Sequence, residues 1–477
     1  MKKLSLFILS FLALLILGCK AHRENGSVKR TSELPNIVMI HIDDLGYHDL
    51  SYTGSEIYET PNIDKLASQS VVFENAYANF PRCVPSRYAL LTATWPVTEK
   101  GVPDDGFALG NIPENRNLIK QIDEAGYHTA FFGKWHLGSG KNGPQAFGFD
   151  YSFAAGKAGS PISYFYPFNK PTNPNRKMNK DPMPDVDEVG EKGDYLNDLL
   201  TSQVIEHIKD NSSKPFFVAL NHYAVHQPIE AKEKDAERNK KQIAAHDFGD
   251  RPEYIEEGTG RTKMRQDNAV YAGMVENMDE NVGRLLDFLK ASGLEENTII
   301  IFSSDHGGLS NDGWKERNLA TSNYPLRAGK GWLYEGGVRV PLFIKWESEL
   351  KPETNSEDIV MLMDILPTLL DITTGKTVED INGKSLLPVL KGDESWDDRT
   401  VFWHSDKARP RNTGESNASA IRSGKWKLVD FYEDDQTELY NLEIDKEEQN
   451  DLSEEFPEIR NRLYKELNKW KSDFSGD

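Results

Sequence analysis

The chain of 477 residues contains 76 acidic and 56 basic side chains, which give a formal net charge of -20. Such a charge excludes a general nucleic-acid binder, because those proteins usually need a basic face. The 36 glycines, 24 prolines and 9 tryptophans are typical of a loop-rich globular protein, and the length exceeds that of one ordinary domain. We therefore expect a large domain followed by a smaller one.

The N-terminus has the pattern of an export signal. Two lysines precede an apolar run at residues 4–17, which is shorter than the roughly 20 residues that a membrane-spanning helix needs. The tetrapeptide that ends at Cys19 resembles the lipobox of bacterial lipoproteins. This resemblance implies a signal peptide at residues 1–18, acylation of Cys19 and a lipid-anchored spacer at residues 19–34. The alternative is an ordinary secretory signal with a chance cysteine. We expect an exported protein that is anchored to a bacterial membrane, in the periplasm or at the cell surface.

The first folded part, residues 35–390, alternates short apolar runs with helical stretches. The runs that we expect to be buried strands of a mostly parallel sheet are residues 36–42, 129–132, 216–221, 298–302 and 340–346. Apolar side chains recur at helical spacing from Met274 to Leu289. A further helix is expected from Ser356, with Pro367 kinking it or starting a new one. The pattern predicts an α/β fold in which helices flank a central sheet.

The second part, residues 391–477, has a different pattern. Short apolar runs separated by turns lie at residues 400–404, 420–422, 426–431 and 438–442, and a charged helix is expected at about 457–474. We expect a small α+β domain with an antiparallel sheet. The acidic stretch at residues 443–455 is expected to be a solvated face.

Acidic side chains follow two of the predicted strands, where a parallel sheet presents its carboxyl edge. Asp43 and Asp44 follow the first strand, and Asp305 follows a later one, directly before His306. An aspartate pair by itself is more often a turn or a helix cap. A third carboxylate from a second strand end instead favours a shared divalent cation, and hard oxygen ligands favour Ca²⁺, or less readily Mg²⁺.

Several cations are expected at the same edge, and they could hold an anion. They are Arg87, Lys134, His136, His226 and Lys330. Each of these residues alone could be an ordinary surface lysine, a surface arginine or a hydrogen-bonded loop histidine. Together, after strand ends, they predict a site for a tetrahedral oxyanion beside the metal.

Cys83 is the single cysteine that remains once Cys19 is assigned to the signal. An unpaired cysteine in an exported protein needs an explanation, and a small buried free thiol is the simplest one. However, the pentapeptide Cys83-Val84-Pro85-Ser86-Arg87 resembles the signature of the formylglycine-dependent sulfatases. In that family the cysteine is oxidised to an aldehyde, so a thiol intended for conversion has no reason to be paired.

The resemblance to these sulfatases covers nearly the whole mature chain. The matching segments are PNIV at 35–38, DDLGY at 43–47, GKWHLG at 133–138, HQP at 226–228, SDHGG at 304–308, GKGWLYEGGVRVP at 329–341 and ELYNL at 438–442. It implies the alkaline-phosphatase-like fold with a small C-terminal domain, and hydrolysis of sulfate esters. It also implies a Ca²⁺ cofactor and a maturation enzyme that makes formylglycine at position 83.

The resemblance further implies a role for each site residue. The implied metal ligands, together with the modified residue 83, are Asp43, Asp44, Asp305 and His306. The cations implied to orient the hydrated aldehyde and to neutralise sulfate are Arg87, Lys134 and Lys330. His226 would protonate the leaving oxygen after the hydrate has attacked sulfur, and His136 would help to expel sulfate and regenerate the aldehyde.

Two positions depart from the family pattern. His306 stands where many relatives have asparagine, and an imidazole is a less natural Ca²⁺ ligand than an amide oxygen. Ala93 follows Leu91-Thr92, where the signature usually ends in glycine, and this change would weaken recognition by the maturation enzyme. The core pentapeptide is intact.

The expected substrate is a sulfated carbohydrate outside the cytoplasm, because a membrane anchor suits work on a polymer. His404, Arg409 and Arg411 are candidates for contacts with sugar carboxylates or further sulfates in a pocket between the two domains, and they are equally well explained as loop cations. Two alternatives remain open: a phosphodiesterase or phosphonate hydrolase of the same superfamily, and a non-catalytic glycan-binding lipoprotein.

Overall fold

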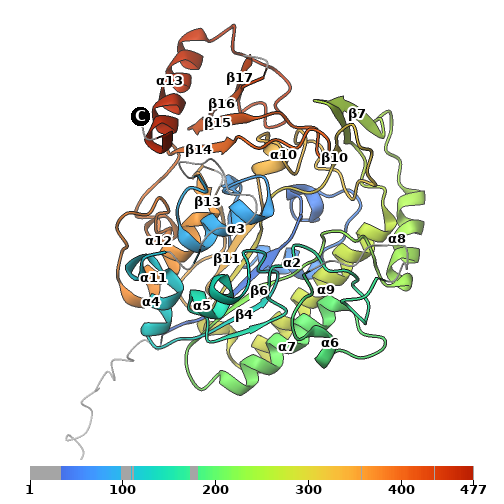
Figure 1. The fold of residues 1–477 in the computed structure, drawn as a ribbon, viewed down its shortest axis with the longest axis vertical. Coiled ribbons are helices and arrows are strands. Elements are labelled where there is room, and N and C mark those ends of the chain that lie inside the picture. Colours follow the sequence, from blue (N-terminus) through green and yellow to red (C-terminus); the bar gives the residue numbers. More distant parts are fainter. Residues whose placement is uncertain are drawn as a thin grey trace, which may run out of the picture. The chain divides into compact units, whose positions relative to one another are not determined.

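The computed structural model describes residues 34–97, 109, 112–171, 181–355, 357–433 and 436–475. The chain from Pro35 to Asp477 forms one compact unit. The strands of its main sheet are β1 (Asn36–Ile42), β2 (Val71–Phe73), β4 (His128–Gly133), β5 (Tyr151–Phe153), β6 (Phe216–Asn221), β9 (Thr298–Ser304), β11 (Leu342–Lys345) and β12 (Glu353–Asn355). Their order in the sheet is β12-β2-β11-β9-β1-β6-β4-β5. Figure 1 labels β4, β6 and β11 of this sheet among the helices that surround it. Among the described residues, no helix has both the length and the apolar character that a membrane span requires.

Helices cover both faces of this sheet, as the sequence predicted. On one face, Val38 and Ile40 of β1 pack in a core with α2 (Pro61–Ala67), α7 (Leu196–Asn211) and α9 (Ala269–Ala291). On the other face, Ile37 and Met39 pack with α3 (Cys83–Thr92), α4 (Leu118–Glu124) and α11 (Ile365–Thr374). Successive side chains of a strand point to opposite faces, so the continuous apolar run of β1 fills two cores at once.

The remaining elements are short or lie at the edges of the unit. The helices are α5 (Pro144–Phe147), α6 (Val186–Val189), α8 (Glu233–Ala245), α10 (Glu335–Val338) and α12 (Leu387–Leu390). The strands are β3 (Ala76–Tyr77), β7 (Tyr254–Glu257), β8 (Gly260–Lys263), β10 (Asn311–Asp312) and β13 (Val360–Met361). Single 3-10 turns lie at Tyr47–Asp49, Glu114–Arg116, Gly140–Asn142, Glu295–Asn297 and Leu362–Asp364.

The direction of the strands decides where the polar side chains meet. β1 pairs in parallel with both β6 and β9, and Ile42 at the end of β1 lies beside Ser304 at the end of β9. The residues that follow these strands therefore emerge at one edge. β11 was expected to be parallel, but it runs antiparallel to β9, with Leu342 paired to Ser303. The loop before β11 stays at the carboxyl edge, so the strand enters the sheet from that edge and must run back.

The predicted helix from Ser356 is wrong in its start. Ser356 lies outside the described residues, while Val360–Met361 forms β13, which pairs with β3. The helix α11 begins at Ile365 and places Pro367 in its first turn. A proline costs little there, because the first N–H groups of a helix have no partner within the helix. The alternative that Pro367 starts a new helix is therefore the one observed.

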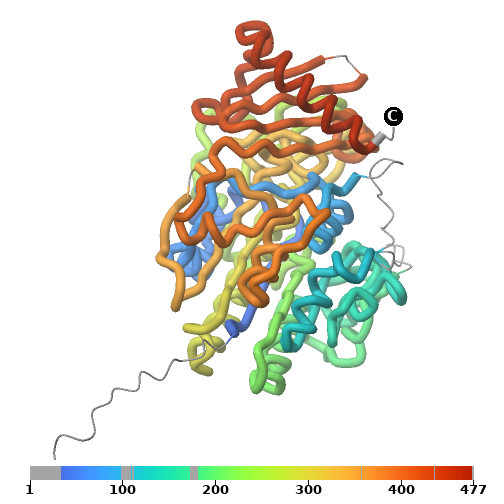
Figure 2. Tube along the Cα trace, turned by 90° about the vertical axis from the view of Figure 1, so that its left-hand side faces the viewer, coloured from blue at the N-terminus to red at the C-terminus, as the bar shows by residue number. Residues whose placement is uncertain are grey.

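The C-terminal part has the antiparallel sheet that the sequence predicted. Its strands are β14 (Thr400–Ser405), β15 (Ala418–Ser423), β16 (Trp426–Phe431) and β17 (Gln436–Asn441), paired in that order. The helix α13 (Pro457–Ser475) lies across this sheet and buries Leu463 and Leu467 against it (Figure 2). The boundary that we place between residues 390 and 391 stays a prediction.

One acidic stretch differs from its prediction. Residues 443–455 were expected to be a solvated face, but Glu448 is only 1% exposed. Its carboxylate lies 2.8 Å from the ammonium nitrogen of Lys427, which is completely buried in β16. A buried lysine requires a buried counterion, and the charge pattern of the stretch gave no sign of this partner.

Candidate active site

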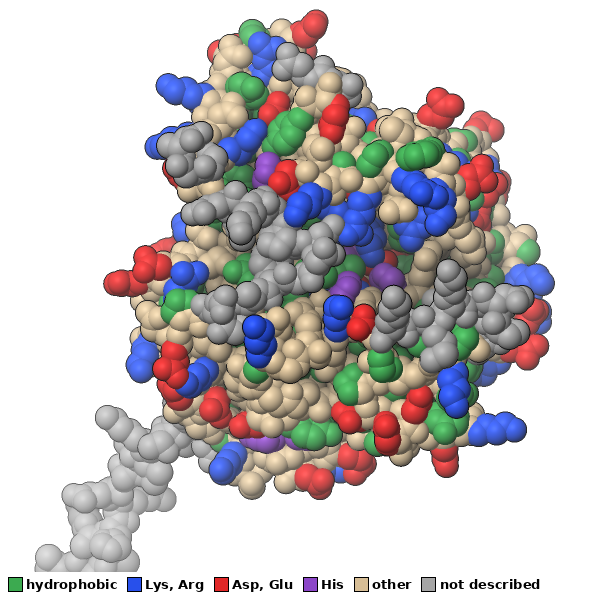
Figure 3. Space-filling view, viewed as in Figure 1, with side chains coloured by type: hydrophobic (Ala, Val, Ile, Leu, Met, Phe, Trp, Pro, Cys, Tyr) green, Lys and Arg blue, Asp and Glu red, His purple; other side chains and the backbone are tan. Residues whose placement is uncertain are grey.

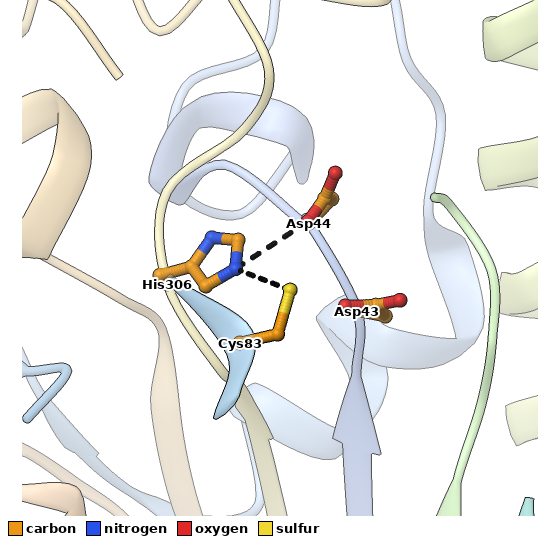
Figure 4. A group of neighbouring side chains, drawn as sticks. All are labelled: Asp43, Asp44, Cys83 and His306. Carbon is orange, nitrogen blue, oxygen red and sulfur yellow. Dashed lines mark hydrogen bonds and ion pairs between the residues drawn. The ribbon is translucent and has the colours of Figure 1, made fainter. Parts of the chain in front are cut away.

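Four side chains that could hold a metal meet at the carboxyl edge of the main sheet. One ligand atom from each of Asp43, Asp44, Cys83 and His306 lies within 4.8 Å of the others (Figure 4). The two aspartates follow β1, His306 follows β9, and Cys83 is the first residue of α3. Asp44 has a φ of 62°, a left-handed conformation that aspartate tolerates better than most residues. The predicted convergence of these strand ends is therefore observed.

The thiol of Cys83 is buried and surrounded by positive charge. Its Sγ lies 3.2 Å from Nε2 of His306 and 3.5 Å from Nζ of Lys330. Burial raises the pKa of Cys83, but the nearby charges of Lys134, Lys330 and His306 outweigh burial and hold it well below its ordinary value. The same surroundings would stabilise negative charge on an oxygen placed at this position. The Sγ atom of Cys83 shows where an oxygen of the oxidised residue would lie.

Three of the predicted cations hold the carboxylates in place. Nζ of Lys134 forms an ion pair with Asp43, and Nζ of Lys330 lies 2.5 Å from Oδ1 of Asp44. Arg87 donates from Nε to Oδ2 of Asp305 at 3.0 Å. All three cations are largely withdrawn from solvent, so they act on the site at short range and with little screening.

The donor set fits a hard divalent cation. Oδ1 of Asp43 is buried and has no hydrogen-bond partner among the described residues. Burial raises the pKa of this carboxyl well above its ordinary value, although Lys134 opposes the rise. Nδ1 of His306 lies 2.9 Å from the carbonyl of Gly307, so this nitrogen donates, and Nε2, which faces Cys83 and Asp44, is the nitrogen that would bind a metal when the ring is neutral. Asp43, Asp44 and His306 could thus ligate Ca²⁺ together with residue 83.

The third predicted carboxylate has a different position. Asp305 is not one of the four converging residues, and its Oδ2 accepts a hydrogen bond from Arg87. Its Oδ1 lies 3.5 Å from Nε2 of His306 and accepts a hydrogen bond from the backbone N–H of Asp44 at 3.2 Å. Asp305 therefore borders the group and can reach it through Oδ1. Its role as a ligand stays a prediction.

The two predicted acid–base histidines border the same group. Nε2 of His226 lies 3.7 Å from Oδ2 of Asp44, and its Nδ1 donates to the carbonyl of Gln227 at 2.8 Å. Burial lowers the pKa of His136, whereas a hydrogen bond with Cys83 raises it. His136 packs directly on Gly159, where a Cβ would lie only 2.2 Å from Nε2 of His136. Glycine at 159 therefore leaves room for this ring.

Sequence reasoning missed the residue that joins the loops around the site. The side chain of Asn323 is buried, and its Nδ2 donates to the carbonyls of Gly308 and Ala328, both at 3.0 Å. Gly308 follows His306 and Ala328 precedes Lys330, so one amide fixes the loops that carry two site residues. No strand end or motif marked Asn323. The close approach of Gly329, where an added Cβ would lie 2.3 Å from this amide, is visible only in the structure.

A cavity of about 400 Å³ opens beside the site. Its lining residues are Arg82, His226, Gln227, Lys315, Arg317, Lys330, Arg409, Asn412 and Thr413. Of the three predicted substrate contacts, Arg409 lines this cavity. His404 and Arg411 are not among the lining residues. His404 is hydrogen-bonded to Ser419 at 2.8 Å, and the Arg411 guanidinium lies over the ring of Trp314.

A mostly parallel sheet that presents carboxylates, a buried cysteine and cations at one edge suits hydrolysis of an oxyanion ester. Residues 35–375 match the sulfatase family, and residues 328–473 match the C-terminal region of N-sulphoglucosamine sulphohydrolase. The chain therefore belongs to the sulfatase family, and it is a sulfuric ester hydrolase.

Individual relatives agree with this assignment. A sulfatase of Formosa agariphila is 32% identical over 90% of this chain and 86% of its own length. An N-acetylgalactosamine-6-O-sulfatase of Bacteroides thetaiotaomicron is 26% identical over 94% of this chain and 95% of its own. Among solved structures, Ps i-CgsB in complex with k-i-k-neocarrahexaose has a TM-score of 0.73 and 28% identity, covering 92% of this chain and 93% of its own.

Proposed function

We propose that the protein removes sulfate from a sulfated carbohydrate, with a formylglycine derived from Cys83 as nucleophile and Ca²⁺ as its metal. The observation that carries the proposal is the convergence of Cys83 with Asp43, Asp44 and His306 within 4.8 Å. The names of relatives support the substrate class, since one is an N-acetylgalactosamine-6-O-sulfatase and another was solved in complex with k-i-k-neocarrahexaose.

The proposal assigns a distinct task to each group. The hydrated aldehyde would supply the nucleophilic oxygen, and bound Ca²⁺ would supply Lewis-acid polarisation of the sulfate oxygens. Lys134 and Lys330 hold positive charge against the position of Cys83 and would neutralise the ester sulfate. Arg87, through Asp305, fixes the carboxylates that face the metal.

The histidines would move protons at two different atoms. Nδ1 of His226 already donates to the carbonyl of Gln227, so a proton for the leaving oxygen would come from Nε2 of the doubly protonated ring. Burial lowers the pKa of His226 to about 3, and the carboxylate of Asp44 beside Nε2 opposes this and favours the protonated form. His136 lies against Cys83 and is positioned to take a proton from the hydrate at residue 83. In this proposal His226 is the general acid and His136 is the general base of the same buried site.

We also propose export and lipid anchoring through Cys19. The support is the apolar run at residues 4–17 and the lipobox-like tetrapeptide. Residues 1–33 lie outside the described part of the chain. An anchored enzyme would act on sulfated glycans at the membrane surface or in the periplasm.

The test of this function compares sulfate with phosphate esters. We expect the protein, made in a host with a formylglycine-generating enzyme, to hydrolyse para-nitrophenyl sulfate with a kcat/KM at least about tenfold above that for para-nitrophenyl phosphate, a difference of about 1.4 kcal/mol. A chelator should abolish turnover, and added Ca²⁺ should restore it. Faster phosphate hydrolysis would favour the phosphodiesterase alternative. Glycan binding without turnover of either ester would favour the non-catalytic lipoprotein.

A further inference from the structure

Trp314 is an exposed aromatic residue next to the lining of the cavity beside the reaction centre. It is 69% exposed, more than any other aromatic residue of the described chain. The following residue, Lys315, and then Arg317 line the cavity, whose wall also includes His226 and Lys330 of the site. Figure 3 shows lysine and arginine side chains gathered beside histidines near the centre of the face it draws. A substrate that extends from the reaction centre along this loop would therefore meet the indole ring.

The loop that carries Trp314 is fixed through its backbone. Oδ2 of Asp312 accepts a hydrogen bond from the backbone N–H of Arg317 at 3.1 Å, which closes the loop on both sides of the tryptophan. The backbone N–H of Lys315 donates to the carbonyl of Arg411 at 3.1 Å. The position of the indole is therefore set by a closed loop that is tied to a second chain segment.

This second segment also positions the ring of Trp314. The Arg411 guanidinium lies over the indole, 5.7 Å from its centroid. Gly313 packs so closely on the segment that an added Cβ would lie 1.8 Å from the carbonyl oxygen of Pro410. Arg409 of the same segment lines the cavity. Because Arg411 covers one face of a ring that stays mostly exposed, the opposite face is open to solvent.

An open, flat aromatic face suits a sugar ring. One face of a pyranose consists of C–H groups, so it can pack on an indole and remove apolar surface of both rings from water. The indole N–H can still donate to a hydroxyl group. Single exposed apolar side chains are common and need no ligand. Trp314 differs from these because its loop is already ordered and adjoins the cavity, so a bound sugar would order little more of the protein.

We propose that Trp314 stacks on a further sugar residue of the substrate, beyond the sugar whose sulfate ester is hydrolysed. The preferred substrate is therefore an oligosaccharide or a polymer, and not a monosaccharide or an aryl ester. Trp314 is the binding residue, and Arg411 is a positioning residue that holds the ring from its other face. The inference rests on the proposed function, because it names the length of the substrate of that same site.

The test compares substrates of different length. Sulfate release per ester group is measured for the sulfated monosaccharide, the disaccharide and the hexasaccharide of chondroitin sulfate and of carrageenan. In the series that is hydrolysed faster, we expect kcat/KM for the hexasaccharide to exceed that for the monosaccharide by at least about tenfold. The difference should lie mainly in KM, because a ring outside the reaction centre binds the ground state and the transition state alike.

Variants then link this length preference to the ring. Trp314→Ala should lower the preference about tenfold, whereas Trp314→Phe should keep most of it, because a smaller flat ring remains. Tyr464→Ala removes another exposed aromatic side chain, on α13, and is the matched control that should keep the preference. Trp314→Ala should melt within a few degrees of the wild type, because the ring that it removes is mostly exposed.

The outcomes separate this inference from the proposed function. If para-nitrophenyl sulfate is hydrolysed and none of the saccharides is, the proposed carbohydrate substrate fails, and the Trp314 site fails with it. If the saccharides are hydrolysed with the same kcat/KM at every length, the carbohydrate substrate stands and the Trp314 site is overturned. The site is also overturned if the length preference survives in Trp314→Ala.

Discussion

Replacing Cys83 with alanine is expected to lower kcat/KM for a sulfate ester by about a thousandfold or more, because the nucleophile that we propose at this position is lost. Cys83 is the first residue of α3, and its thiol points at His306. The other members of the converging group cannot take its place, because Asp43 and Asp44 form ion pairs with Lys134 and Lys330, and His306 would bind the metal. Steady-state kinetics with para-nitrophenyl sulfate measures the loss.

The same variant should keep its fold. Alanine is smaller than cysteine and suits the first turn of a helix, so the melting temperature should change by only a few degrees. Saccharide binding in the neighbouring cavity should also persist, because its lining residues do not include Cys83. A Cys83→Ala protein that is folded and retains turnover near the wild-type rate would exclude position 83 as the source of the nucleophile.

Replacing Lys427 with methionine is expected to have the largest effect on stability, a loss of about 3–5 kcal/mol in the free energy of unfolding. The Lys427 ammonium is fully buried and lies 2.8 Å from carboxylate oxygens of both Glu335 and Glu448. Methionine fills a similar volume but leaves two buried carboxylates without their shared cation. Denaturant titration of the two proteins measures the difference.

Lys425→Met is the matched control on the adjacent turn. Lys425 is 49% exposed and pairs at 3.1 Å with Glu443, which is also exposed. Such surface pairs contribute about 0–1 kcal/mol, so this variant should unfold almost like the wild type. Equal effects of the two substitutions would show that burial does not decide the contribution of Lys427.

The pH dependence of the Lys427→Met loss gives a second check. Burial raises the pKa of Glu448 to about 7, with Lys427 opposing the rise, and removal of Lys427 should raise it further. An acid with a raised pKa in the folded state binds more protons folded than unfolded, so lowering the pH stabilises the folded state through this group. The loss should therefore be smaller at about pH 5 than at about pH 8.

This buried ion cluster also connects the C-terminal sheet to the site. Lys427 belongs to β16, whereas Glu335 begins α10, five residues after Lys330. The backbone N–H of Glu335 donates to Glu448 at 2.6 Å, so the segment that follows Lys330 is fixed from both sides. The small sheet thus contributes to the position of a residue at the reaction centre.

The sequence predicted those parts of the fold and site that depend on local patterns. The runs at β1, β6 and β16 have the predicted bounds because each is an uninterrupted strand of buried side chains. Because residues that follow parallel strands meet at the carboxyl edge of the sheet, the sequence predicted that Asp43, Asp44 and His306 lie close together. The pentapeptide motif identified Cys83 as the fourth member of this group.

The parts that escaped prediction depend on contacts between distant segments. Asn323 acts through the carbonyls of Gly308 and Ala328, and Arg317 becomes part of a cavity wall only when its loop meets Arg409. Glu448 was predicted to be solvated like the other acids of its stretch, but Lys427 of β16 lies beside it and pairs with it. Residue type and spacing do not encode such pairings, because tertiary packing creates them.

The most direct measurement is the mass of the peptide that contains position 83, taken from protein made in a host with a formylglycine-generating enzyme. We predict an aldehyde, which carries oxygen in place of sulfur and two hydrogens fewer than cysteine, in the fraction of molecules that turns over sulfate esters. A sample that hydrolyses sulfate esters at full rate while every such peptide keeps its unmodified thiol would contradict it.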